Sequence, residues 1–235
     1  MSALLWFYGV IPSVRVCPVF SLLKKGTEIM SAATKSTKQT TVKSKKKSST
    51  ERLVVTAVLI GLATALSMIT LYKLPMGGSI TLLSMLPIII ISVKYGVGWG
   101  LTGAFAYSLI QLGLDIGNGL FAWGLSPIGI VGSIFLDDII AYTVLGFSGM
   151  FRKKGVPGIC AGVFITVFVK FICHFVSGGL IFGSFAPDIF SNGWIYSLAY
   201  NGSYMLPELI FTMIGSVILF KTPQFAKLVE NKTEN

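Results

Sequence analysis

The sequence is poor in charge, histidine and cysteine. Only 12% of its 235 residues are charged, about half the share of an ordinary soluble domain. By contrast, 53% are hydrophobic and the mean hydropathy is +0.78. The single histidine and three unpaired cysteines exclude a histidine-rich metal site and offer no disulfide framework. The phosphate-loop, H-E-x-x-H and G-x-S-x-G motifs are absent. We therefore expect a membrane protein that is not an enzyme and has no metal or cofactor.

Positive charge is concentrated near the start of the chain. The net charge is +10, and nine of the nineteen basic residues lie in 24–52. This distribution predicts a basic, disordered cytoplasmic tail over 1–52 that touches anionic lipid, and no binding of nucleic acid. Met30 opens a stretch typical of a natural start, so we predict that 1–29 is an over-extended gene start.

Long apolar segments fill the rest of the chain. The six segments are 53–71, 79–93, 96–114, 126–150, 156–175 and 203–220. A spanning helix needs about 20 predominantly apolar residues. The second segment, which contains Pro87, is therefore marginal in length and can also be tilted or partly re-entrant.

The basic residues between these segments predict their orientation. Lysine and arginine are enriched in cytoplasmic loops. They occur at Lys94, in the triplet 152–154 and at Lys221, whereas the opposite loops carry only Lys73. The predicted fold is an all-α membrane protein, a six-transmembrane-helix bundle over 53–222 with both termini cytoplasmic. Residues 223–235 form its cytoplasmic C-terminal tail.

Polar and aromatic residues gather in 170–208, which this topology places in the last outer loop and the adjoining helix ends. The stretch holds His174, the only histidine, and Lys170 shares its helix face at i, i+4. Asp137 and Asp138 lie inside the fourth segment, where ionisable groups indicate function. Successive α-helical positions point about 100° apart. We therefore expect one aspartate to face a site and the other to meet a neighbouring helix or the polar interface. Lys170 is placed to neutralise one of them.

Small residues recur every four positions in the first segment, at Ala57, Gly61 and Ala65. This spacing lets another helix approach closely. It is consistent with packing inside the bundle or with docking of another membrane subunit.

Four motifs together resemble the thiamine-specific substrate-binding (S) component of energy-coupling factor vitamin transporters. They are KLPMGGSITLLSMLPIIIISVKYG, FLDDIIAY, KFICHFVSGGLIFGSFAP and YSLAYNGSYMLPE. The resemblance covers about 53–222. It implies a plasma-membrane protein of a prokaryote that captures thiamine from outside the cell. It also implies a transmembrane coupling subunit, which would dock on Ala57, Gly61 and Ala65, and two cytoplasmic ATPases.

The resemblance also implies the binding residues. The thiazolium cation or the amino group of thiamine would meet Asp137, and the pyrimidine edge would meet polar side chains. Aromatic rings would stack on the ligand. The predicted set is Asp137, His174, Phe182, Trp194, Tyr196 and Asn201.

This chain departs from the family pattern at three places, one of which is a longer loop between Phe185 and Trp194. Gly77-Gly78 replaces a tryptophan of some members, and Asp138 replaces a tyrosine. The alternatives are an S component for another vitamin or a thiamine precursor, a stand-alone proton-coupled carrier, or an intramembrane enzyme using Asp137, Asp138 and His174. We expect Asp138 to contribute less to binding than Asp137.

Overall fold

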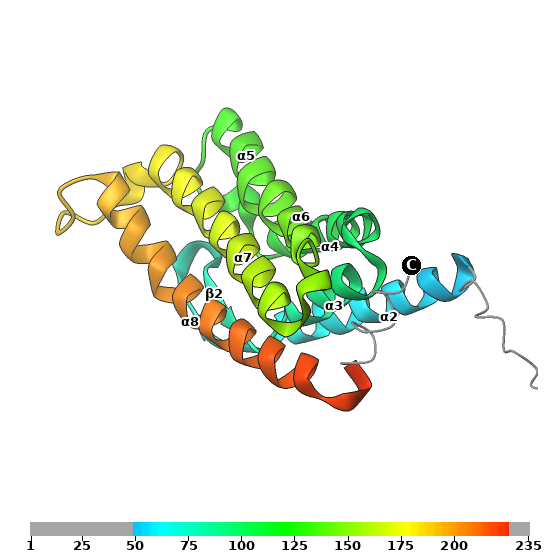
Figure 1. The fold of residues 1–235 in the computed structure, drawn as a ribbon. Coiled ribbons are helices and arrows are strands. Elements are labelled where there is room, and N and C mark those ends of the chain that lie inside the picture. Colours follow the sequence, from blue (N-terminus) through cyan, green and yellow to red (C-terminus); the bar gives the residue numbers. More distant parts are fainter. Residues whose placement is uncertain (1–48, 226–235) are drawn as a thin grey trace, which may run out of the picture. The chain divides into compact units, whose positions relative to one another are not determined.

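The computed structural model describes residues 49–225, and the predictions about 1–48 and 226–235 lie outside these residues. The described part is helical apart from one β-hairpin (Figure 1). Four of its helical segments are long and apolar enough to cross a membrane: Ser49–Met68, Pro127–Phe147, Arg152–Leu180 and Gly193–Lys221. The predicted membrane protein with apolar helices is thus confirmed, whereas the count of six spans and their orientation stay predictions.

The first helix is followed by a hairpin. Helix α2 covers Ser49–Met68, and strand β1 (Thr70–Lys73) pairs antiparallel with β2 (Ser79–Thr81). The turn contains the short helix η1 (Pro75–Gly77), whose last residue has a φ of 96°. Only glycine adopts this backbone conformation without strain.

The segment predicted as the second span, 79–93, is not a single helix. Its first residues form β2, and helix α3 covers only Leu86–Tyr95, with Pro87 in its first turn. A helix of 10 residues is about 15 Å long, half the thickness of the hydrocarbon core. Helix α3 ends at Gly96, whose φ is 98° and whose N–H bonds to the Ser92 carbonyl.

The segment predicted as the fourth span is continuous but irregular. Helix α5 (Pro127–Ser133) begins at Ser126, whose side chain accepts a hydrogen bond from the Gly129 N–H. It continues as a π-helix, η3 (Ile134–Ile140), then as α6 (Ala141–Thr143) and the 3-10 helix η4 (Val144–Phe147). A π-helix bonds i to i+5 and often occurs at functional sites.

The last two long helices are longer than predicted. Helix α7 covers Gly155–Leu180, and α8 covers Gly193–Lys221 with Asn192 as its N-cap. Figure 1 shows them side by side, and they are in contact along their length. Helix α8 begins ten residues before position 203, where the last span was predicted to begin. The connection between α7 and α8 is therefore shorter than the predicted loop and consists only of 181–192.

Helix α4 (Val97–Gly117) packs on α3 and on η4. Where α3 meets η4 and the turn after it, the Ser92 hydroxyl donates to the Gly146 carbonyl at 2.5 Å and accepts from the Gly149 N–H at 2.9 Å. Arg152, in η5 (Arg152–Lys154), donates to the Val93 carbonyl at 3.2 Å. The buried side chains of the core include Ile88, Ile89, Ile91, Val163 and Val167. None of these five core side chains lines the cavity described below.

Candidate ligand-binding site

A cavity of about 470 Å³ lies among α2, the hairpin, α4, η3, α7 and α8. This volume is typical of a site for a small molecule. Five of the six predicted binding residues line it, and Trp194 does not: the lining includes Asp137, His174, Phe182, Tyr196 and Asn201.

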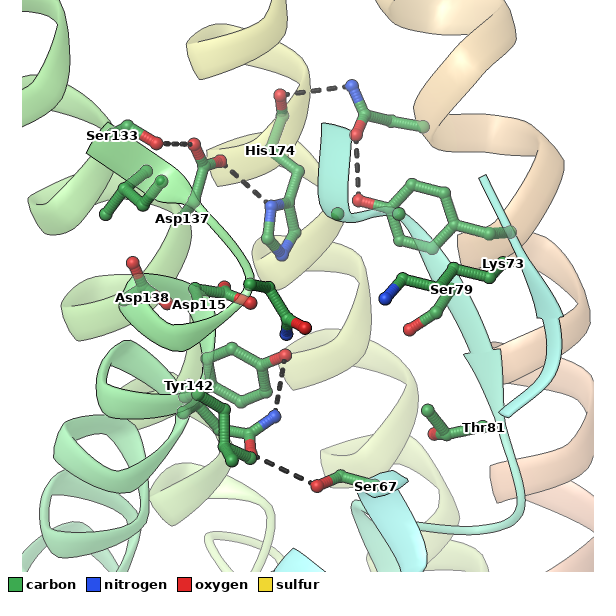
Figure 2. Close-up of a pocket in the computed structure, with 18 of the residues that line it drawn as sticks. Ser67, Lys73, Ser79, Thr81, Asp115, Ser133, Asp137, Asp138, Tyr142 and His174 are labelled. Atoms are coloured by element: carbon green, nitrogen blue, oxygen red, sulfur yellow. Dashed lines mark hydrogen bonds and ion pairs between the residues drawn. The ribbon is translucent and has the colours of Figure 1, made fainter. Parts of the chain in front are cut away.

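Asp137 and His174 are the centre of a hydrogen-bond network (Figure 2). The Asp137 Oδ1 atom lies 2.9 Å from Nδ1 of His174. Its Oδ2 atom accepts from Ser133 at 2.9 Å and from Ser177 at 2.5 Å. The network joins η3 to α7, so the carboxylate fixes the orientation of the imidazole ring.

Asn201 extends the contact between α7 and α8. Its amide nitrogen donates to the carbonyl oxygens of His174 at 3.1 Å and Ser197 at 3.0 Å. Its amide oxygen accepts from the Tyr204 hydroxyl at 2.9 Å. Asn201 therefore lines the cavity with its amide already engaged inside the protein.

Trp194 and Tyr196 lie in the first turns of α8 and not in a loop. The Tyr196 ring contacts Phe190 and Tyr200, with centroids 5.3 and 5.7 Å away. The Trp194 ring instead packs on Phe175 at 5.4 Å. Trp194 thus packs outside the cavity, whereas Tyr196 lines it.

Trp123 is a cavity residue that the sequence predictions missed. Its ring makes an edge contact with Phe182, with centroids 6.1 Å apart, and both residues line the cavity. It also lies so close to Gly77 that a Cβ there would be 3.1 Å from the indole. The available signal was a tryptophan in 115–125, the short segment predicted to connect two spans.

The hairpin is fixed to α8 by polar contacts. The Tyr200 hydroxyl donates to the Pro75 carbonyl and accepts from the Gly78 N–H at 3.1 Å. Farther along the hairpin, the backbone N–H of Thr81 donates to Glu208 at 2.7 Å. Gly77-Gly78 therefore forms part of the cavity wall. These are the two glycines that replace the tryptophan of some family members.

Lys170 and His174 both line the cavity, which confirms that they share a helix face. The Lys170 Nζ atom lies 3.9 Å from the centre of the Tyr142 ring, a cation–π contact. Asp115, Asp138 and Glu208 line the same region, so four acidic side chains and two lysines, Lys73 and Lys170, line the cavity. The balance favours a cationic ligand.

Comparison with known proteins places this architecture in a family. The family described as "Thiamine transporter protein (Thia_YuaJ)" matches residues 53–227. The chain belongs to this family. Among its relatives, the thiamine transporter ThiT of Bacillus subtilis (strain 168) is 35% identical over 185 residues, 73% of this chain and 91% of that protein. The thiamine transporter ThiT of Lacticaseibacillus paracasei is 28% identical over 163 residues, 63% of this chain and 77% of that protein.

A solved structure, ThiT from Listeria monocytogenes, shares the fold with a TM-score of 0.60 and 23% identity. The match covers 76% of this chain and 96% of that one. Membership of the thiamine transporter family makes this chain a transport protein and not an enzyme. It is a multi-pass protein of the prokaryotic plasma membrane, as its apolar helices also indicate.

Proposed function

We propose that this protein is the substrate-binding component of an energy-coupling factor importer, and that it captures thiamine from outside the cell. The observation that carries the proposal is the cavity, which combines aromatic rings, an oriented imidazole and an excess of carboxylates. Thiamine presents matching groups, because it joins an aminopyrimidine to a permanently charged thiazolium ring. The relatives named as thiamine transporters support the same ligand.

Each predicted binding residue receives a role in this proposal. Asp137 holds His174 toward the ligand, and Tyr196 offers its hydroxyl to the pyrimidine edge. Phe182, together with Trp123, provides a ring face. Asn201 and Trp194 act indirectly, because both hold α8 against α7: Asn201 bonds the His174 carbonyl, and Trp194 packs on Phe175.

The proposed topology has six spans, with both termini in the cytoplasm and the cavity open to the outside. The membrane domain would be 53–222, with cytoplasmic tails over 1–52 and 223–235. Support comes from α7, where the basic triplet 152–154 precedes its first residue and His174 lies near its other end. Positive charge favours the cytoplasmic side, so the cavity end would face outward.

Delivery of thiamine would use a transmembrane coupling subunit and two cytoplasmic ATPases. The proposed docking face is Ala57, Gly61 and Ala65, which are all exposed on α2, opposite the buried residues Thr56, Ile60 and Ala63. A Cβ added at Gly61 would meet no atom within 4 Å. The face is therefore open to another helix.

The direct test is isothermal titration of the detergent-purified protein with thiamine. We expect saturable binding at micromolar ligand or below, and its absence would overturn the proposal. Competition by the isolated pyrimidine alcohol as strong as that of thiamine would favour a precursor transporter. Uptake into vesicles without ATPase subunits would favour a proton-coupled carrier.

A further inference from the structure

Strand β1 has two unlike faces. Thr70 and Lys73 line the cavity, whereas the two side chains between them, Leu71 and Tyr72, do not. In a regular strand, residues three positions apart point to opposite faces. Here the pairing with β2 shifts between Thr70 and Tyr72, and such a bulge re-aims the side chains beside it. Two successive apolar side chains therefore lie outside the cavity wall, where they are 56% and 60% exposed.

These side chains extend an apolar surface that begins on α2. Val58 and Leu62 of this helix are exposed, and so is Ile69, which joins the helix to β1. Helix α2 is long and apolar enough to cross the membrane. In the chain by itself, lipid is therefore the neighbour of its exposed apolar side chains, and the same surface continues onto the outward face of the hairpin.

The depth of the hairpin follows from its contacts with α8. The backbone N–H of Thr81 donates to Glu208, and the Tyr200 hydroxyl bonds to the turn of the hairpin. At 1.5 Å per residue, Glu208 lies about 20 Å and Tyr200 about 30 Å from Lys221, where α8 ends. A lysine at the end of a span marks the membrane boundary, and the hydrocarbon core is about 30 Å thick. The hairpin therefore lies in the third of the core that is farthest from Lys221.

Strand β1 is suited to this boundary region. Among the described residues it pairs only with β2, so the backbone groups of its other edge need partners from outside the sheet. Such groups are too costly to leave unpaired in hydrocarbon, but water and lipid headgroups reach the boundary. Tyrosine is enriched there because its ring is apolar and its hydroxyl is polar. Tyr72 and the adjoining Leu71 therefore match the transition from headgroups to acyl chains.

We propose that the outward face of β1, formed by Ile69, Leu71 and Tyr72, is inserted into the lipid leaflet at the cavity end, and that lipid holds the hairpin over the ligand. The opposite face of the hairpin carries Lys73 and Thr81, which line the cavity. Moving the hairpin away from the cavity would transfer apolar side chains from lipid to water, which is unfavourable. Release of a bound ligand therefore depends on the lipid. This second part rests on the proposed function, whereas the location of the strand does not.

The first test locates the strand without a ligand. A Leu71→Cys variant, with the native cysteines replaced by alanine, is labelled with the fluorophore NBD and placed alone in phosphatidylcholine nanodiscs. We expect quenching by a nitroxide near the headgroup end of the acyl chains, and little quenching by aqueous iodide. The same label at Lys73→Cys, on the cavity face, is the matched control and should not respond to the lipid nitroxide. Quenching of the Leu71→Cys label by iodide, or its shielding from both quenchers by protein, would overturn the inference.

The second test measures release of labelled thiamine from the chain in the same nanodiscs and keeps the native cysteines. Leu71→Asn should speed dissociation at least fivefold, whereas Leu71→Phe, which stays apolar, should remain near the wild-type rate. Leu198→Asn is the matched control, because Leu198 of α8 is 53% exposed and does not line the cavity. It should leave the rate unchanged.

The outcomes separate the two proposals. Equal acceleration by both asparagine variants, or none at Leu71, would overturn the role of lipid in holding the hairpin. Failure of the wild-type protein to bind thiamine would overturn the proposed function and leave the location of β1 to be decided by the quenching experiment, which needs no ligand.

Discussion

The two halves of helix α7 differ in what they contact. Near its start, Gly158 and Gly162 lie against backbone carbonyl groups of Phe151 and Ser148, with no room for a side chain. Beyond Val167, Lys170 and His174 face the cavity. The glycines of the first half pack against backbone atoms, whereas the second half packs against side chains and also carries the polar groups that line the cavity. Changes in the first half should therefore act on stability, and changes in the second on binding.

The largest effect is expected from Gly162→Val. A Cβ there would overlap the Ser148 carbonyl, which belongs to the backbone and cannot rotate away. Overpacking of this kind costs about 3 kcal/mol, so the melting temperature in detergent should fall sharply. The control is Gly61→Val, the same change on an open helix face, which should leave the melting temperature unchanged. Equal melting temperatures for the two variants would contradict the conclusion that the first half of α7 is closely packed.

His174→Ala should produce the next largest effect, on binding instead of stability. It removes the imidazole and leaves Oδ1 of Asp137 without its partner. We expect thiamine affinity to fall at least tenfold, or about 1.4 kcal/mol, as measured by calorimetry. Because the two residues form one network, His174→Ala and Asp137→Asn should combine less than additively. Full additivity would mean that Asp137 acts on the ligand independently of His174.

Phe182→Ala should weaken thiamine binding by a smaller factor. The ring lines the cavity beside Trp123, and an aromatic contact is worth about 0.5–1.5 kcal/mol beyond its buried area. Trp194→Ala is the matched comparison, since Trp194 packs on Phe175 outside the cavity. Titration should show a clear loss for the first variant and a minor one for the second. The reverse order would place Trp194 at the ligand.

The smallest effect on binding is expected from Gly61→Val, which should leave thiamine affinity within about twofold, below 0.6 kcal/mol. The side chain would project from the exposed face of α2, away from the cavity. Uptake of labelled thiamine by cells that contain the coupling subunit and ATPases should nevertheless fall, because the face that would meet the coupling subunit is no longer flat. Unimpaired uptake would remove this face from the docking proposal.

Much of the fold could be predicted from hydropathy, because the apolar segments at 53–71, 126–150 and 156–175 correspond to helical spans. The prediction of a single spanning helix was wrong at 79–93, where the apolar run forms a strand and a short helix. Hydropathy reports burial in an apolar environment and does not distinguish these structures. It also missed the first ten residues of α8, since a polar and aromatic helical turn has the composition of a loop.

Five of the six residues predicted for the candidate site line the cavity, and Nδ1 of His174 lies 2.9 Å from Oδ1 of Asp137. Trp123 was missed because its proximity to Phe182 depends on how two loops far apart in the sequence fold toward each other. The prediction that the two aspartates of η3 point in separate directions assumed an α-helix. The segment is π-helical, and both residues line the cavity. No local sequence signal reveals that change of helix type.

The π-helix of η3 also has a consequence for comparison among relatives. In a π-helix each backbone hydrogen bond joins residues five positions apart, one more than in the α-helices on either side. Loss of a single residue from Ile134–Ile140 would restore α-helical bonding without disturbing the flanking turns. It would rotate Asp137 and Asp138 relative to each other. An alignment gap of one position beside these residues would therefore mark a transporter whose cavity has a different arrangement of charge.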